Sequence, residues 1–239
     1  MQLILLAAGK GSRLPSRYRF APKSMAKIND KTVLEHNLNF YKKFKNKTIV
    51  TGYKAKKLST FIKENNFKEI KNKEYKSTNM VNSLFKVKKL VSNEIVICYS
   101  DIIFDEKIYT NLDKNKNKNI ILLKKNWLKI WKGRMTKKEI LNDAEDLNVK
   151  KKMLISIGEK IKVKLPKYQY MGIIKLRFKD FLKLKSFFQK LNNKKIDFTS
   201  FLNSALKSKI IKLHVSITNK FWYEIDNAND IKFTKKNIW

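Results

Sequence analysis

Apolar residues follow two patterns in the first half of the chain. Short runs rich in apolar residues predict buried strands, and apolar residues spaced three or four positions apart predict helices. The strands are expected at 2–6, 47–51 and 95–99, and the helices at 32–44, 55–65 and 79–91. Asp30 is available as a cap for the helix predicted at 32–44. This alternation predicts an α/β fold with a parallel sheet.

The second half has a more antiparallel character. Strands are expected at 120–123, 154–157, 170–175 and 212–216, and helices at 178–191 and 198–206. No repeat or proline-rich linker separates the halves, and 239 residues suit one large domain better than two with thin cores. We therefore expect a single domain over 1–239, with a Rossmann-like, mixed and mostly parallel sheet flanked by helices on both faces.

The composition allows a folded core but complicates the choice of partner. The chain is 43% hydrophobic, which excludes wholesale disorder, and its net charge is +35. Such a charge alone would favour a protein that binds nucleic acid or an anionic membrane surface, and this alternative stays open. Only five of the 55 basic residues are arginine, however, and lysine is spread over every segment. We expect no specific nucleic-acid partner and a surface field that attracts anionic substrates such as nucleotides.

Cysteine content and the first residues bear on the compartment. Cys98 is the single cysteine, so an intrachain disulfide is excluded. The apolar run Leu3 to Ala8 is too short for a signal sequence or a membrane span. We expect a cytoplasmic protein without a membrane span, and the sequence leaves open whether it forms a homodimer.

A glycine-containing loop follows the first predicted strand. Glycines let backbone N–H groups approach an anion closely, so this loop predicts a phosphate cradle. Arg13 offers a fork of donors for a triphosphate, and Lys23, behind Pro22, could neutralise charge at the α-phosphate. The residues in and next to this loop that are expected to bind the nucleotide are Leu6, Ala7, Ala8, Gly9, Gly11, Ser12, Arg13 and Lys23. The spacing matches neither a Walker loop nor a dinucleotide-binding loop.

The run Leu-x-Ala-Gly-x-Gly-x-Arg-Leu at 6–14, followed by Pro-Lys, resembles the N-terminal motif of the nucleoside triphosphate transferases that activate sugar phosphates and phospho-alcohols. Asp101 follows the predicted central strand, and Asp226 ends the sequence Glu-Ile-Asp. The resemblance implies that Asp101 and Asp226 bind a divalent metal, expected to be Mg²⁺, and that both act in catalysis together with Arg13 and Lys23. Magnesium suits this role because it prefers carboxylate oxygens and keeps several waters.

Further segments resemble one branch of these enzymes. The sequence Thr-Asn-x-x-x-Ser-Leu at 78–84 is similar to phosphocholine and 2-aminoethylphosphonate cytidylyltransferases, which implies that Asn79 and Ser83 lie beside the nucleotide. Segments 131–134, 143–145, 156–160 and 169–172 are similar to cytidylyltransferase-like proteins linked with phosphonate metabolism. For the acceptor we expect Arg134 to bind the phosphonate and Asp143 or Glu145 to bind the amine. Aromatic residues such as Trp131 and Tyr170 are expected to form a wall around the amine.

The resulting hypothesis is a cytidylyltransferase that moves CMP from CTP to a small phosphonate or phosphate bearing an amine, and releases pyrophosphate. The acceptor oxygen is already a nucleophile, so no general base is required. The alternative within the class is a sugar-1-phosphate nucleotidyltransferase that uses UTP or dTTP.

Overall fold

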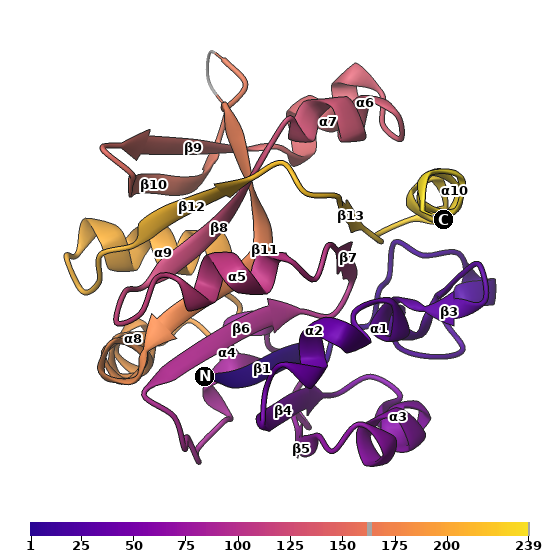
Figure 1. Ribbon diagram of the computed structural model, residues 1–239, viewed down its shortest axis with the longest axis horizontal. Coiled ribbons are helices and arrows are strands. Elements are labelled where there is room, and N and C mark those ends of the chain that lie inside the picture. The colour runs from indigo at the N-terminus through magenta and orange to yellow at the C-terminus, as the bar shows by residue number, and fades with distance from the viewer. Residues whose placement is uncertain (162–163, 239) are drawn as a thin grey trace.

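A nine-stranded sheet, in the order β5-β4-β1-β6-β11-β8-β12-β10-β9, forms the centre of the protein in a computed structural model that describes residues 1–161 and 164–238 (Figure 1). The strands, in sheet order, are β5 (Lys68–Lys71), β4 (Asn46–Thr51), β1 (Gln2–Ala7), β6 (Glu94–Tyr99), β11 (Tyr168–Arg177), β8 (Ile120–Lys125), β12 (His214–Thr218), β10 (Met153–Lys160) and β9 (Glu145–Lys150). The pairings make β11 and β10 run opposite to the other seven. The sheet is therefore mixed and mostly parallel, and both halves of the chain contribute to it.

Most of the helices are short. They are α1 (Val33–His36), α2 (Leu38–Lys42), α3 (Ser59–Glu64), α4 (Met80–Phe85), α5 (Ile108–Asp113), α6 (Trp127–Lys132), α7 (Lys137–Asp143), α8 (Phe178–Leu191), α9 (Phe198–Lys207) and α10 (Ala228–Asn237). Two small ribbons pair β2 (Lys27–Ile28) with β3 (Lys31–Thr32), and β7 (Ile102–Phe104) with β13 (Trp222–Glu224). Within the described residues, every helix is too short or too polar to cross a bilayer.

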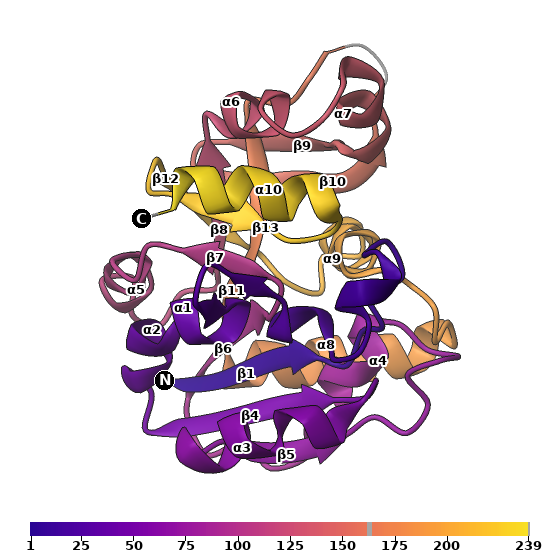
Figure 2. The same ribbon diagram turned by 90° about the vertical axis from the view of Figure 1, so that its right-hand side faces the viewer.

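Helices cover both faces of the sheet, as the sequence predicted. Alternate residues of β1 point to opposite faces, so Ile4 and Leu6 join one core while Leu3 and Leu5 join another. The first core also contains residues of α4, α8 and α9, and the second contains residues of α2, α3 and α5. Figure 2 shows α5 and α2 on one side of the sheet and α8 on the other.

Several predicted elements have other boundaries in the structure. Helix α8 spans 178–191 as predicted, whereas the helix expected at 32–44 is divided into α1 and α2 at Asn37. The expected cap Asp30 is wrong: Thr32 caps α1 through a capping box with Glu35. The helix expected at 79–91 ends at Phe85, and the one expected at 55–65 begins as a 3-10 turn.

The carboxyl ends of β1 and β6 position the candidate site. The glycine loop follows β1, Asp101 follows β6, and β11 crosses antiparallel beside β6. Pairing of β11 with β8 shifts register between Tyr170 and Ile174, and Gly172 has a positive φ of 79° there. A Cβ on Gly172 would lie 2.8 Å from the Tyr99 ring. The absent side chain therefore lets the Tyr99 ring at the end of β6 lie directly against the backbone of β11.

We predict that Gly172→Ala destabilises the protein by about 1–3 kcal/mol, because alanine is strained at positive φ and would collide with Tyr99. Urea denaturation measures the change. Gly9→Ala is the matched control, since a Cβ there has no neighbouring atom within 4 Å. Equal stability of the two variants would contradict the close approach described here.

Candidate active site

The glycine loop and Lys23 are packed against each other. Gly11 has a φ of 64°, and a Cβ on it would lie 2.9 Å from Cβ of Lys23. Pro22 precedes a 3-10 turn at Lys23–Met25, whose Met25 N–H donates to the Pro22 carbonyl at 2.8 Å. Glycine at position 11 is required for two reasons, its backbone conformation and the space that Lys23 occupies.

Lys23 joins the two aspartates that the sequence singled out. Its ammonium lies 2.5 Å from Oδ2 of Asp101 and also donates to Oδ1 of Asp226. Nη2 of Arg13 donates to the other oxygen of Asp226 at 2.7 Å. The four residues expected to act in catalysis thus meet at one place, although 203 positions separate Lys23 from Asp226.

The charges in this cluster stabilise one another. Burial alone would lower the pKa of Lys23, but the charges of Asp101 and Asp226 outweigh it and raise that pKa. Burial would likewise raise the pKa of Asp226, but Lys23 and Arg13 outweigh it and lower that pKa. Both groups are therefore held in their charged forms at neutral pH.

A second ion pair, behind the first, fixes the position of Asp226. Asp230 is fully buried, and its Oδ2 accepts from the backbone N–H of Asp226 at 2.8 Å and of Asn227 at 2.9 Å. The Arg134 guanidinium donates to Oδ1 of Asp230 and lies 3.7 Å from Glu224. Arg134 is only 8% exposed and lies outside the lining of the main cavity. Its predicted role in binding a phosphonate is not supported by this placement, because its charge is used within the protein.

Glu224 is a residue of the site that sequence reasoning did not select. Burial, together with the negative charges of Asp226 and Asp101, raises the pKa of Glu224 to about 8. The signal was present in the sequence, since Glu224 begins the same Glu-Ile-Asp segment that ends at Asp226.

A cavity of about 360 Å³ opens beside the cluster. Of the residues expected to act in the site, its lining includes Arg13, Lys23, Asn79, Asp101, Trp131, Glu145, Tyr170 and Asp226. Its lining also includes Asp143, which was expected as an alternative to Glu145, and Asp197, Phe198 and Thr199, which the sequence did not indicate.

A smaller cavity of about 100 Å³ lies next to the glycine loop. It is lined by Leu6, Ala8, Gly9, Asn79 and Ser83, all expected at the nucleotide, and by Tyr75, Thr78 and Met80. Ala7 is buried in the sheet core and Ser12 is exposed outside both linings, so neither side chain reaches a cavity.

Two carboxylates on the wall of the main cavity share one hydroxyl. Oγ1 of Thr199 is 2.7 Å from Oε1 of Glu145 and 3.0 Å from Oδ1 of Asp197. Burial raises the pKa of Glu145, and the charges of Asp197 and Asp143 add to this despite the Thr199 hydrogen bond. In the part of the chain that the structure describes, no Lys or Arg nitrogen lies within 4.0 Å of either carboxylate. This wall therefore has unneutralised negative charge in a strongly basic protein.

Solved nucleotidyltransferases share this fold, and nucleotidyltransferases are also among the relatives of the chain in sequence. The CTP:phosphoglutamine cytidylyltransferase of Campylobacter jejuni is 26% identical over 97% of this chain and 98% of its own length. The structure of CTP:phosphocholine cytidylyltransferase from Streptococcus pneumoniae superposes with a TM-score of 0.80 at 18% identity, covering 100% of this chain and 99% of that one. The inositol-1-phosphate CTP transferase of T. maritima superposes with a TM-score of 0.77 at 16% identity, covering 98% of this chain and 95% of that one. No protein-family model matches the chain.

We predict that Arg134→Ala lowers the free energy of unfolding by about 3–5 kcal/mol, because it leaves Asp230 buried without a counter-charge. Lys132→Ala, which removes an exposed cation two residues away, is the control and should change stability little. Chemical denaturation compares the two variants. Wild-type stability of Arg134→Ala, with a loss only of acceptor binding, would show that Arg134 binds the acceptor.

Proposed function

We propose that the protein transfers a cytidylyl group from CTP to a small phosphate or phosphonate that carries an amine, and acts in the cytoplasm. The observation that carries the proposal is the Lys23 ammonium between Asp101 and Asp226, with Arg13 beside them, on the lining of a cavity. An acceptor oxygen would attack the α-phosphorus of CTP, and the bond from that phosphorus to pyrophosphate would break. Similarity to cytidylyltransferases of Campylobacter jejuni and Streptococcus pneumoniae supports the choice of CTP.

Arg13 and Lys23 have different parts in this reaction. The Arg13 side chain is 61% exposed, so its guanidinium is accessible to the phosphates of an entering nucleotide. Lys23 is half-buried between two carboxylates and is held in its charged form. It is suited to stabilise the negative charge that develops on the α-phosphate in the transition state.

The two aspartates fit a magnesium ion. Oδ1 of Asp101 is buried and has no hydrogen-bond partner in the described protein, so it is a carboxylate oxygen available to a cation. Asp226 would supply the second carboxylate, whose oxygens also accept from Lys23 and Arg13. Two carboxylates suffice for Mg²⁺, which completes its shell with waters and phosphate oxygens. When bound, the ion would reduce repulsion between the anionic acceptor and the triphosphate and stabilise the departing pyrophosphate.

The wall formed by Glu145, Asp197 and Thr199 supports an acceptor with a positive charge. Two carboxylates without a cation of their own are complementary to an ammonium group, and Trp131 and Tyr170 provide aromatic surface in the same cavity. A hexose 1-phosphate has no cation to place there. The wall therefore favours the amine-bearing acceptor over the sugar-phosphate alternative.

Asp101→Asn is predicted to keep the fold and to lower kcat by about 100-fold or more, because a carboxamide binds Mg²⁺ poorly. Pyrophosphate release is measured with four nucleoside triphosphates, a panel of amine-bearing and sugar phosphates, and added or chelated Mg²⁺. Asp105→Asn is the control, since Asp105 binds the backbone N–H of Lys107 outside the cavity lining. A fully active Asp101→Asn would remove Asp101 from the metal site, and a preference for a hexose 1-phosphate would overturn the acceptor class.

Glu145→Gln is predicted to raise the KM for an amine-bearing acceptor about 10-fold or more while leaving the KM for CTP unchanged, because a charge-assisted contact is lost. An acceptor in which a hydroxyl replaces the amine serves as the comparison and should respond little to the substitution. Equal effects on both acceptors would show that Glu145 does not recognise the amine.

A further inference from the structure

Asn72 organises one wall of the smaller cavity without lining it. It follows β5, is 1% exposed, and its backbone N–H donates to the Thr51 carbonyl at 2.7 Å. Its side-chain amide donates through Nδ2 to Oγ1 of Thr78 at 3.0 Å and to Oγ of Ser83 at 2.9 Å. The cavity itself is lined by Thr78 and Ser83.

The orientation of the Asn72 amide is fixed by a third bond. Its Oδ1 accepts from the backbone N–H of Glu74 at 3.0 Å. A backbone N–H can only donate, so the oxygen of the amide must face Glu74 and the NH₂ group must face the two hydroxyls. Both hydroxyls consequently accept a hydrogen bond from Asn72, and each keeps its own proton to donate elsewhere.

The protons of the two hydroxyls differ in whether a good acceptor in the protein already binds them. Thr78 donates to the Glu74 carbonyl at 2.8 Å, so it has only a lone pair left for a ligand. Ser83 reaches only the Asn79 carbonyl, at 3.5 Å, which is the long limit for such a bond. Its proton is therefore available to a better acceptor in the cavity. Of these two hydroxyls, Thr78 thus presents only an acceptor to the cavity, whereas Ser83 can present a donor.

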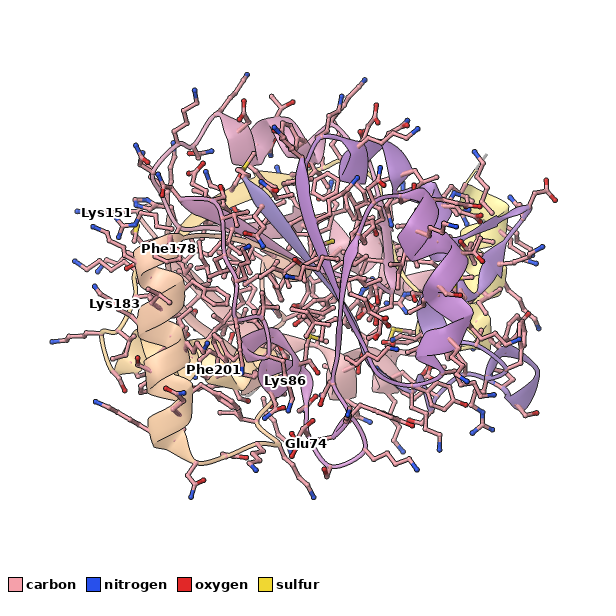
Figure 3. All side chains as sticks on the ribbon, turned by 90° about the horizontal axis from the view of Figure 1, so that it is seen from below. Glu74, Lys86, Lys151, Phe178, Lys183 and Phe201 are labelled. Carbon is pink, nitrogen blue, oxygen red and sulfur yellow. The ribbon has the colours of Figure 1, made fainter. Side chains whose placement is uncertain are left out.

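The loop at 72–79, which contains Asn72 and Thr78, is held in place on two sides. The Glu74 carboxylate forms an ion pair with Lys86, which follows α4, and Figure 3 shows these two side chains near one another. On the other side a Cβ on Gly52 would lie 2.8 Å from the Ala8 carbonyl and from Cβ of Tyr75, so the loop packs on Gly52, which itself packs on Ala8 after β1. The hydroxyls thus hold a defined position next to the phosphate loop.

We propose that Asn72 is a positioning residue that makes this cavity selective for cytosine over uracil. Cytosine presents an amino donor at N4 beside an acceptor at N3, whereas uracil presents an acceptor at O4 beside a donor at N3. Thr78, whose free site is a lone pair, would accept from the N4 amine of cytosine but would meet the O4 acceptor of uracil with a second acceptor, and the Ser83 proton can be donated to N3 of cytosine. This inference rests on the proposed cytidylyl transfer and names the residues that select its nucleotide.

The first test is Asn72→Asp, which has the same shape but offers only acceptors. Ser83 must then donate its proton to Asp and can offer only lone pairs to the base. The ratio of kcat/KM for CTP to that for UTP is expected to fall by about 10-fold or more. A folded Asn72→Asp whose ratio stays within twofold of wild type would overturn the proposal, because a merely structural residue would lower both values together.

Ser83→Ala decides the question if Asn72→Asp does not fold. It removes the donor and is expected to lower kcat/KM for CTP about 10-fold with little change for UTP. Ser77→Ala is the control, because Ser77 is exposed, lies outside the cavity lining and also donates to the Glu74 carbonyl. An unchanged ratio in Ser83→Ala sinks this inference alone, whereas a wild-type protein that transfers no nucleotide sinks the proposed function itself.

Discussion

The ion pairs of Lys23 with Asp101 and Asp226 are the interaction on which the site depends. Two partly buried carboxylates would repel each other, and the ammonium between them removes that repulsion. Gly11 leaves the space for Lys23, and the 3-10 turn after Pro22 sets its backbone. Asp230 and Arg134 hold Asp226 from behind. Much of the local sequence is thus explained by the need to place one cation between two anions.

The distribution of acidic residues suits both of the substrates that we propose, the nucleotide and the acceptor. Six of the 20 acidic side chains of the chain line the main cavity: Asp101, Asp143, Glu145, Asp197, Glu224 and Asp226. The rest of the protein is strongly basic, so its overall field favours the approach of an anionic nucleotide. Inside the cavity the local charge is different, and the wall at Glu145 and Asp197 favours a cationic group. A zwitterionic acceptor meets both conditions.

The parts of the site that could be predicted from the sequence lie in short segments, most of them directly after a strand. The glycine loop after β1, Asp101 after β6 and the late Glu-Ile-Asp segment were found because their chemistry lies in short contiguous runs. Arg134 is predicted at the acceptor because an arginine fork suits a phosphonate. Its ion pair with Asp230 is not visible in the sequence, since Asp230 lies 96 positions away and no local pattern links the two. Asn72 was missed for a similar reason, since an asparagine after a short strand looks like an ordinary turn residue. Short helices such as α5 and α6 owe their existence to tertiary packing, which periodicity over six residues does not reveal.

The separation of 203 positions between Lys23 and Asp226 also has a consequence for how the protein folds. A contact between such distant residues closes a very long loop, so it should form late, after β1, β6 and β11 have paired. A nascent chain could build the glycine loop early and still lack its partner aspartate until synthesis reaches α10. Nucleotide bound at the completed site would then stabilise the last contact to form, and so link substrate supply to the lifetime of the folded enzyme.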